Sequence, residues 1–550
     1  WTNRHRQPTN KLVFNAHSRY VVPKGETGFV AKTLELLRMN PLHAMIKDRV
    51  IEIQQVLFVH GPKAPPPADA GLKFEFAGDT QTAMIVHLPA PIQQGQSVTV
   101  MVEFDFRLPQ KMGRWGQWEG VTFLSNWLPV LAYYDDGGWL PTPFIPWHQP
   151  FFNEAGIYHA NITLSEDQVV GCSGEVLKKI KLPDGSVRLE VVAAGVRDFS
   201  FLCSARYREH VGLLNRGEGC PPLKIRVLAF PEHEFYARKM LQTALEAVPV
   251  YEKWFGRYPW TTLTIGESVC GWNGNECSTM IMIDERVFGM PHLADRYVDY
   301  LVSHEICHQW WYNVVGTNGY AETWMDESVA TWASHRLITQ KRGSKNDELM
   351  RYPKNLRWLP NIKRRNYRIY GLYSALGRGS NSPVVQEIPR FGHLANLFNM
   401  TYDKGSKIIG MIAERLGQTG FLDFMRVIYK KYQFRILLVK DYQRELEAYT
   451  GQSWQEFFQH WIHGEGLSDW AIKKVKVKQL NAPTPAGPAI CPCGRRGSYE
   501  VTVMLKQKGK FAEQTTLGLS FGKKDSYPIR IPILPELPHL DLEDGMGTVQ

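Results

Sequence analysis

The sequence predicts a multidomain α+β protein with a β domain first, a mixed and then helical domain second, and a β-rich segment last. Three patterns predict this order. Alternating apolar and polar residues dominate positions 1–208, helix-spaced apolar residues dominate much of positions 209–465, and alternation returns in positions 466–550. A chain of 550 residues also exceeds what one hydrophobic core normally serves, so these three ranges are taken as the domains.

The first range carries strand signals and one short helix signal. Val98–Phe106 alternates between apolar and polar residues, which is the period of a half-buried strand. Leu182–Gly185, with the sequence Leu-Pro-Asp-Gly, separates two alternating runs and predicts a hairpin. A short helix is expected near Lys32–Met39, and no longer helical pattern is found in this range. A β domain is therefore expected here.

The second range combines two strand signals with a series of helices, and the third range returns to strands. Helices are expected at Glu234–Phe255, Arg296–Val315, Trp324–Ile338, Tyr402–Leu416, Phe421–Tyr432, Asp441–Tyr449 and Trp454–Ile462. Strands are expected at Thr261–Ile265, Met280–Ile283, Ala471–Val477 and Tyr499–Lys506. Gly256 ends the first of these helices and Gly417 the fourth, as glycine commonly does after a helix.

The composition is that of an ordinary globular protein, with 44% hydrophobic and 21% charged residues. No run of about 18 apolar residues occurs, so no membrane-spanning helix is expected within this stretch. Because the chain begins at Trp1 and not at Met, a processed or partial chain is expected, and an extracytoplasmic location (periplasmic, secreted or membrane-associated) is favoured. Eight cysteines are too few for a disulfide framework in a chain of this length.

One segment is strongly basic. Lys341–Arg368 holds ten Lys or Arg residues and two acids, an excess of eight positive charges. Two interpretations remain open, namely a solvated loop and helix face, or a patch for an anionic partner or a membrane surface. No nucleic-acid recognition motif accompanies the charge, so no nucleic-acid partner is expected.

A metal-binding pattern lies inside the helix expected at Arg296–Val315. His304-Glu305-Ile306-Cys307-His308 has the form HExxH. Residues i and i+4 share one face of a helix, so the imidazoles of His304 and His308 can reach one metal ion. Glu305 lies one step round the helix, where it can act on a water at that ion as a general base without ligating the metal.

A third ligand follows on the next expected helix. Eighteen residues separate His308 from Glu327. Two His and one Glu with water in the fourth position is the catalytic type of zinc site, whereas structural sites usually close all four positions with protein ligands. The sequence therefore predicts one zinc ion per chain, held by His304, His308 and Glu327.

HExxH followed after eighteen residues by Glu327 resembles the gluzincin aminopeptidases, the family of aminopeptidase N and leukotriene hydrolase. Further segments are similar to motifs of that family: Val196–Phe199, Phe255–Pro259, Asn273–Glu276, Thr401–Gly405 and Phe457–Trp461. The resemblance implies an N-terminal β-sandwich or saddle domain, a thermolysin-like catalytic domain with a helical extension, and a C-terminal β-rich domain. It also implies a zinc metallopeptidase that removes N-terminal residues from peptides.

The resemblance further implies roles for individual residues. Tyr402 matches the family tyrosine that stabilises the oxyanion, and Glu305 matches the catalytic base. Glu276 matches the carboxylate that binds the free α-ammonium group of a peptide substrate, with Gly274 and Asn275 beside it at the substrate. Asn275 stands where the family has Met, so the shape of the pocket for the first side chain is expected to differ.

Two other kinds of function remain open. The zinc site could serve another substrate, as in an epoxide hydrolase or an endopeptidase, although Glu276 favours a substrate with a free N-terminus. The chain could also be a non-catalytic scaffold with the family fold. The presence of all three ligands, the base and the tyrosine argues against the scaffold.

Overall fold

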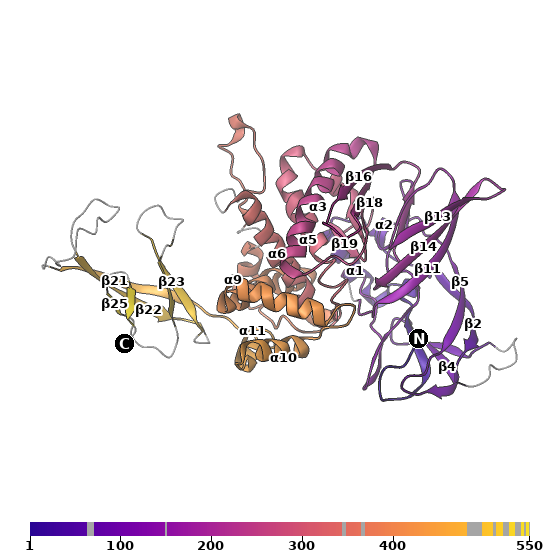
Figure 1. Ribbon diagram of the computed structural model, residues 1–550, viewed down its shortest axis with the longest axis horizontal. Helices are drawn as coiled ribbons and strands as arrows, with labels where there is room; N and C mark the ends of the chain where they lie inside the picture. The colour runs from indigo at the N-terminus through magenta and orange to yellow at the C-terminus, as the bar shows by residue number, and fades with distance from the viewer. Residues whose placement is uncertain are drawn as a thin grey trace. The chain divides into compact units, whose positions relative to one another are not determined.

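The computed structural model describes residues 1–62, 71–148, 151–343, 348–364, 369–480, 498–509, 513–520, 527, 529–533, 541–543 and 546–548. Internal contacts divide the chain into two compact units, Trp1–Trp454 and Gln455–Gln550, and each is described by itself. The predicted α+β class is confirmed, with strands dominating the N-terminal part of the first unit and helices its later part (Figure 1). The domain boundaries after residues 208 and 465 stay predictions.

Strands form most of the N-terminal region. Their bounds are β1 Thr9–Asn15, β2 Ile51–His60, β3 Phe74–Ala77, β4 Ala83–Ile92, β5 Thr99–Phe106, β6 Trp115–Trp118, β7 Val121–Leu124, β8 Val130–Leu131, β9 Tyr133–Asp135, β10 Gly138–Leu140, β11 Gly156–Ser165, β12 Val169–Cys172, β13 Glu175–Lys181, β14 Ser186–Val196 and β15 Phe201–Ser204. The main sheets have the orders β3-β4-β1-β8, β11-β14-β13 and β12-β15-β7-β6. The predicted strand at Val98–Phe106 is β5, paired with β2, and the predicted hairpin is the antiparallel pair β13–β14.

Two short helices, α1 Thr27–Leu36 and α2 Pro41–Ala44, lie in the same region. The helix expected near Lys32–Met39 is therefore present, but it begins and ends earlier. Val30 and Leu34 are buried one turn apart on α1, which anchors the helix to the core. Arg38 then takes a left-handed φ of 60°, which ends the helical run.

A five-stranded mixed sheet follows and positions the site. Its strands are β16 Arg208–Leu214, β17 Leu223–Ala229, β18 Thr262–Ser268, β19 Gly274–Cys277 and β20 Met280–Asp284, in the order β16-β17-β18-β20-β19. β19 runs antiparallel to β20 and pairs with no further strand of the described chain, so it is an edge strand. The helix α3 packs against β17 and has the predicted bounds, Glu234–Phe255; Gly256 ends it with a φ of 133°.

Two helices in contact carry the predicted metal ligands. α5 spans Asp295–Cys307, and α6 spans Trp324–Arg342 (Figure 1). The predicted helix Arg296–Val315 is wrong at its C-terminal end. There the backbone carbonyl of His308 accepts hydrogen bonds from both the backbone N–H and the side-chain amide of Asn313, each at 3.0 Å. These bonds satisfy a carbonyl that a longer helix would have used, and the chain turns.

The remaining helices of the first unit are α4 Glu285–Phe288, α7 Ile369–Gly377, α8 Leu394–Phe398, α9 Gly405–Lys431 and α10 Val439–Thr450. Gly417 interrupts α9 with a non-helical φ of 70° and ψ of 154°, where the sequence predicts a helix end. Just before α9, Asn399–Lys404 forms a π-helical turn, η8, which carries Tyr402. Such turns are frequent at functional sites. In the described part of the chain, no helix has the length and apolar content needed to cross a bilayer.

The second unit begins with α11, Gln455–Trp461, and its described strands form antiparallel pairs. The pairs are β21 Trp470–Leu480 with β22 Ser498–Gln507, β23 Thr515–Leu519 with β24 Ile529–Ile533, and β25 Asp541–Glu543 with β26 Met546–Thr548. The strands predicted at Ala471–Val477 and Tyr499–Lys506 lie within β21 and β22.

Part of the basic segment is paired inside the fold. Residues 344–347 and 365–368 of this segment lie outside the described residues. In the described part, cations of the segment form ion pairs with acids on α3 and α5: Lys341 with Glu246, Arg342 with Asp299, and Arg351 with Asp295. These ion pairs show that some of the positive charge of the segment stabilises the fold. Binding of an anionic partner or a membrane surface by this segment stays a prediction.

One buried arginine ties the N-terminal region to later parts of the first unit. Arg197 is 0% exposed and follows directly on β14. Its guanidinium donates hydrogen bonds of 3.0–3.1 Å to four backbone carbonyls, those of Asn153, Asn313, Val314 and Arg435. One side chain therefore provides hydrogen-bond donors to backbone carbonyls of segments that lie far apart in the sequence.

Replacing Arg197 with Ala removes these donors, and each buried acceptor left unsatisfied costs about 1–3 kcal/mol. We expect Arg197→Ala to lower the free energy of unfolding, measured by urea denaturation, by at least about 3 kcal/mol. Arg188 is an exposed arginine on β14 and provides the matched control. Arg188→Ala should change the free energy of unfolding by less than about 0.5 kcal/mol, and equal losses in the two variants would contradict this account.

Candidate active site

Three side chains meet at one point: His304 on α5, His308 directly after α5, and Glu327 on α6. The Nε2 atoms of His304 and His308 are 3.1 Å apart, and Glu327 Oε2 lies 3.2 Å from the first and 3.3 Å from the second. All three residues are buried. They form the one cluster of possible metal ligands found among the described residues, and they are the three that the sequence predicts.

Donor atoms spaced in this way fit a tetrahedral zinc ion. Bonds of about 2.0–2.1 Å from zinc to nitrogen or oxygen place neighbouring ligand atoms about 3.3 Å apart. Two imidazoles and one carboxylate are also the donor set of catalytic zinc sites, in which water takes the fourth position. His308 Nδ1 lies 3.2 Å from the backbone carbonyl oxygen of Trp311, and this contact orients Nε2 toward the other two donors.

Tyr402 reaches the same point from the π-helical turn. Its hydroxyl donates a hydrogen bond to Glu327 Oε1, while the other oxygen of that carboxylate faces the two histidines. Its ring stacks on the ring of His304, with centroids 5.9 Å apart and an angle of 21° between the planes. A phenolic O–H therefore lies beside the expected metal position.

Glu305 faces β19 across a very short distance. A methyl group at Gly274 would lie 2.2 Å from the carboxyl carbon of Glu305, so only glycine lets this strand approach so closely. Burial, and then the charge of Glu276, raise the pKa of Glu305 well above its ordinary range. A carboxylate with raised proton affinity is suited to accept a proton, although a bound cation favours its charged form.

The edge strand β19 presents Glu276 to the same space and turns Asn275 away from it. Glu276 is 6% exposed, and burial raises its pKa. Successive residues of a strand point to opposite faces. The Asn275 side chain accordingly points to the other face, where it donates to Ser125 Oγ at 2.8 Å and accepts from Arg114 Nη1 at 3.1 Å.

One cavity of about 730 Å³ joins these groups, and this volume is typical of a ligand-binding pocket. Of the residues that the sequence places at the site, those lining the cavity are Gly274, Glu276, His304, Glu305, His308, Glu327 and Tyr402. Asn275 does not line it. Further lining residues were missed by sequence reasoning, among them Arg114, His148 and Trp272. Trp272 directly precedes the Asn273–Glu276 motif, whereas Arg114 and His148 belong to no motif that identifies them, and only the tertiary fold brings these two to the cavity.

The sequence around the site matches a known domain. Residues 241–461 match the Peptidase family M1 domain. The chain is similar to Aminopeptidase M1-C of Oryza sativa subsp. japonica, with 25% identity over 181 residues that cover 32% of this chain and 18% of that protein. It is also similar to Aminopeptidase N of Streptomyces lividans, with 23% identity over 198 residues that cover 34% of this chain and 22% of that protein. The matched stretch thus spans about a fifth of the length of each of these relatives.

The fold is similar to that of a solved enzyme. The M1 zinc metallopeptidase from Deinococcus radiodurans superposes with a TM-score of 0.52 and 14% sequence identity, covering 84% of this chain and 87% of that one. A mutant of the same protein has been solved with a Tyr-Ser-Ala substrate bound, and it superposes with the same TM-score of 0.52. At this level of identity the likeness concerns the fold.

Proposed function

We propose that this protein is a zinc-dependent aminopeptidase of peptidase family M1, which removes N-terminal residues from peptides, and the match of residues 241–461 to the Peptidase family M1 domain supports this. One observation carries the proposal. The donor atoms of His304, His308 and Glu327 lie 3.1–3.3 Å apart in the wall of a peptide-sized cavity, with Glu305 beside them. This arrangement combines a metal site of the catalytic type with a base that does not ligate the metal.

The residues of this chain have distinct tasks in the proposed reaction. His304, His308 and Glu327 hold zinc, which when bound supplies a Lewis acid for the scissile carbonyl and lowers the pKa of water. Glu305 accepts a proton from the attacking water on a carboxylate oxygen and then donates it to the nitrogen of the leaving amine. Tyr402 turns its hydroxyl from Glu327 Oε1 to the substrate carbonyl oxygen and donates a hydrogen bond as that oxygen gains negative charge.

Selection of the chain end rests on Glu276. β19 is an edge strand, so its unpaired backbone groups can bind an extended peptide as an additional strand. A peptide bound in this way passes Gly274, which lies against Glu305, and its α-ammonium group meets the Glu276 carboxylate. A carboxylate that is 6% exposed favours such a compact cation through a charge-assisted hydrogen bond.

Two peptides that differ only at the N-terminus test the proposed function. The zinc-loaded wild-type protein should hydrolyse a peptide with a free α-amine and should not hydrolyse its N-acetylated copy. Similar rates on both peptides would identify an endopeptidase. If the zinc-loaded protein hydrolyses neither peptide, the remaining explanations are a non-catalytic scaffold and a zinc hydrolase that acts on another class of substrate.

Glu276→Ala should raise KM for the free-amine peptide about 10- to 100-fold, because a charge-assisted hydrogen bond worth about 1.5–3 kcal/mol is lost. Discrimination against the acetylated copy should fall by the same factor. Glu285, at the start of α4, does not line the cavity, and Glu285→Ala should leave KM unchanged. Full discrimination in Glu276→Ala would remove Glu276 from the ammonium site without touching the zinc chemistry.

Tyr402→Phe should lower kcat about 10²- to 10³-fold, because it removes a donor to the developing oxyanion. KM should change little, since this hydrogen bond strengthens in the transition state. Zinc content must be measured as well, because Tyr402 also contacts the ligand Glu327. A loss of zinc in this variant would show that Tyr402 acts through the metal site. Tyr373, which is 64% exposed, is the control, and Tyr373→Phe should keep both kcat and zinc.

A further inference from the structure

The cavity holds a charged group that the proposed mechanism leaves unused. Arg114, the residue before β6, lines the cavity together with Glu276 and Trp272. Arg114 is only 6% exposed. A guanidinium carries five N–H donors, and buried donors nearly always have acceptors, so the partners of this side chain need to be accounted for.

The described residues satisfy few of these donors. Nη1 donates to Asn275 Oδ1 at 3.1 Å, whereas the buried Nε has no acceptor. Arg114 forms no ion pair with any carboxylate in the part of the chain that the structure describes. The positive charge is therefore buried without a bonded counter-ion, which is costly unless an anion completes the site.

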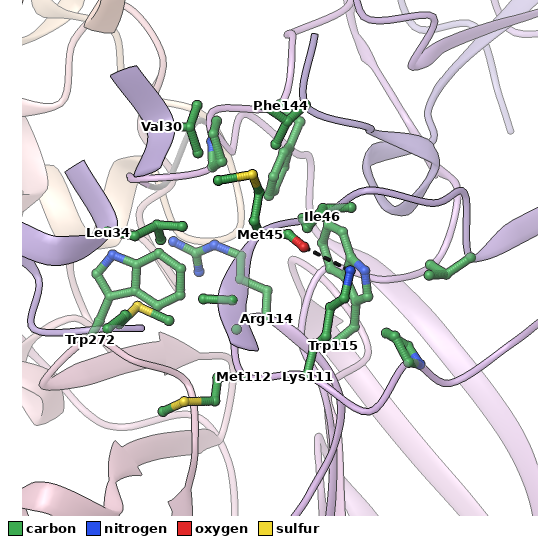
Figure 2. Close-up of a pocket in the computed structure, with 17 residues that line it drawn as sticks. Val30, Leu34, Met45, Ile46, Lys111, Met112, Arg114, Trp115, Phe144 and Trp272 are labelled. Carbon is green, nitrogen blue, oxygen red and sulfur yellow. Dashed lines mark hydrogen bonds between the residues drawn. The ribbon is translucent and has the colours of Figure 1, made fainter. Parts of the chain in front are cut away.

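Arg114 is nevertheless held firmly. Its guanidinium carbon lies 4.7 Å from the ring centroid of Trp272 and 4.9 Å from that of Phe151. Figure 2 shows the guanidinium beside the indole of Trp272. Its backbone carbonyl accepts from the Ser125 N–H at 2.8 Å, and Ser125 Oγ in turn accepts from the Asn275 amide. Aromatic faces and this short network fix the direction of the guanidinium without neutralising it.

A second cavity that Arg114 lines offers little room for an anion. This small cavity has a volume of about 30 Å³, and its walls are largely apolar, with Leu34, Met45 and Phe144 among them (Figure 2). Such a space holds about one water molecule, which carries no charge. The anion must therefore come from the large cavity that contains the metal-ligand cluster.

Glu276 is the carboxylate of the cavity whose charge acts on Arg114. Burial lowers the pKa of Arg114, and the charge of Glu276 acts in the opposite direction, so the two residues interact electrostatically. In the proposed function, however, the Glu276 carboxylate binds the substrate ammonium group. Once a substrate is bound, Arg114 is left beside the first residue of the peptide with no partner for its charge.

We infer, building on the proposed function, that Arg114 binds the side-chain carboxylate of the first residue and that the enzyme prefers peptides beginning with Glu or Asp. A guanidinium is suited to this role because it pairs with a carboxylate in a fixed, often bidentate geometry. The ammonium group and the acidic side chain of such a residue would then be held by Glu276 and Arg114, two buried groups of opposite charge.

Two other arginines line the same cavity and serve as comparisons. Arg286 is already committed, since it pairs with Asp284 at 2.6 Å and donates to three backbone carbonyls. Arg38 is exposed and carries the same unit charge. Arg38→Gln therefore removes a charge from the cavity wall without touching the buried guanidinium.

The test compares glutamyl and glutaminyl amides of a fluorogenic coumarin, which have side chains of nearly equal shape and no C-terminal carboxylate. In the zinc-loaded wild type, kcat/KM for the glutamyl substrate should exceed that for the glutaminyl substrate about 10- to 100-fold. Arg114→Gln should abolish this ratio while keeping activity on the glutaminyl substrate, and Arg38→Gln should retain the ratio. Arg114→Lys, which keeps the charge and is less disruptive to folding, should retain part of it.

Several results would overturn the inference. If the protein cleaves alanyl and leucyl substrates but has nearly equal kcat/KM values for the glutamyl and glutaminyl substrates, the inference is wrong. The proposed aminopeptidase function would still stand. Equal losses on both substrates in Arg114→Gln and Arg114→Lys would show that Arg114 only supports the structure around Glu276. A ratio that survives Arg114→Gln would assign the preference to another group. Failure to cleave any aminoacyl substrate, with zinc bound, would reject the proposed function itself.

Discussion

Replacing Glu305 with Gln should lower kcat about 10²- to 10⁴-fold while leaving the bound zinc in place. Gln keeps the length of the side chain and its close contact with Gly274, but its amide does not accept a proton from water. The metal ligands are untouched, because Glu305 does not belong to the cluster formed by His304, His308 and Glu327. The measurement is kcat on a free-amine peptide, with zinc content determined on the same sample.

Glu218→Gln makes the same chemical change at an exposed position and should keep wild-type kcat. A Glu305→Gln protein that binds zinc and turns over at the wild-type rate would remove Glu305 as the base. Loss of zinc in this variant would instead show that Glu305 supports the metal site, and its effect on kcat would then say nothing about proton transfer.

Replacing His308 with Ala should abolish both zinc binding and peptidase activity. His308 Nε2 lies 3.1 Å from His304 Nε2 and 3.3 Å from Glu327 Oε2, so its removal leaves two of the three protein donors. Mutation of a residue that only hydrogen-bonds to a metal ligand typically lowers metal affinity about 10- to 100-fold. Removal of the ligand itself should therefore lower zinc affinity by more than about 100-fold. Zinc content after dialysis and activity on a free-amine peptide measure the effect.

His87 is the control for this prediction, because its side chain is 47% exposed. His87→Ala should retain zinc and activity. In the wild type, a chelator should remove zinc and activity together, and added zinc should restore both. Activity that persists after the metal is removed would contradict a zinc-dependent reaction.

The cluster of expected metal ligands could be predicted from sequence because its geometry is largely local. His304 and His308 are one helical turn apart, and Glu327 comes from the next helix in the chain. The extent of α5 could not be predicted in the same way. Residues 309–315 are rich in buried aromatic and apolar side chains, which a helix and a packed turn both use. The bonds from Asn313 that close the helix end become apparent only in the folded chain.

The cavity wall shows the opposite case. The motif around Glu276 predicts that its neighbours contact substrate, but β19 is a strand, and its alternation sends Asn275 to the face opposite Glu276. Arg114 and His148 lie more than a hundred residues before the metal-ligand cluster, in segments without a catalytic motif. They reach the cavity only through the tertiary fold of the N-terminal region, which apolar periodicity does not specify.

The central claim is that two imidazoles and one carboxylate bind a single zinc ion and leave one position for solvent. The most direct test is a crystal structure of the zinc-loaded protein. The account predicts zinc within about 2.0–2.2 Å of His304 Nε2, His308 Nε2 and a Glu327 oxygen, with water in the remaining position. A fourth protein ligand in that position, or zinc bound away from these three side chains, would contradict it.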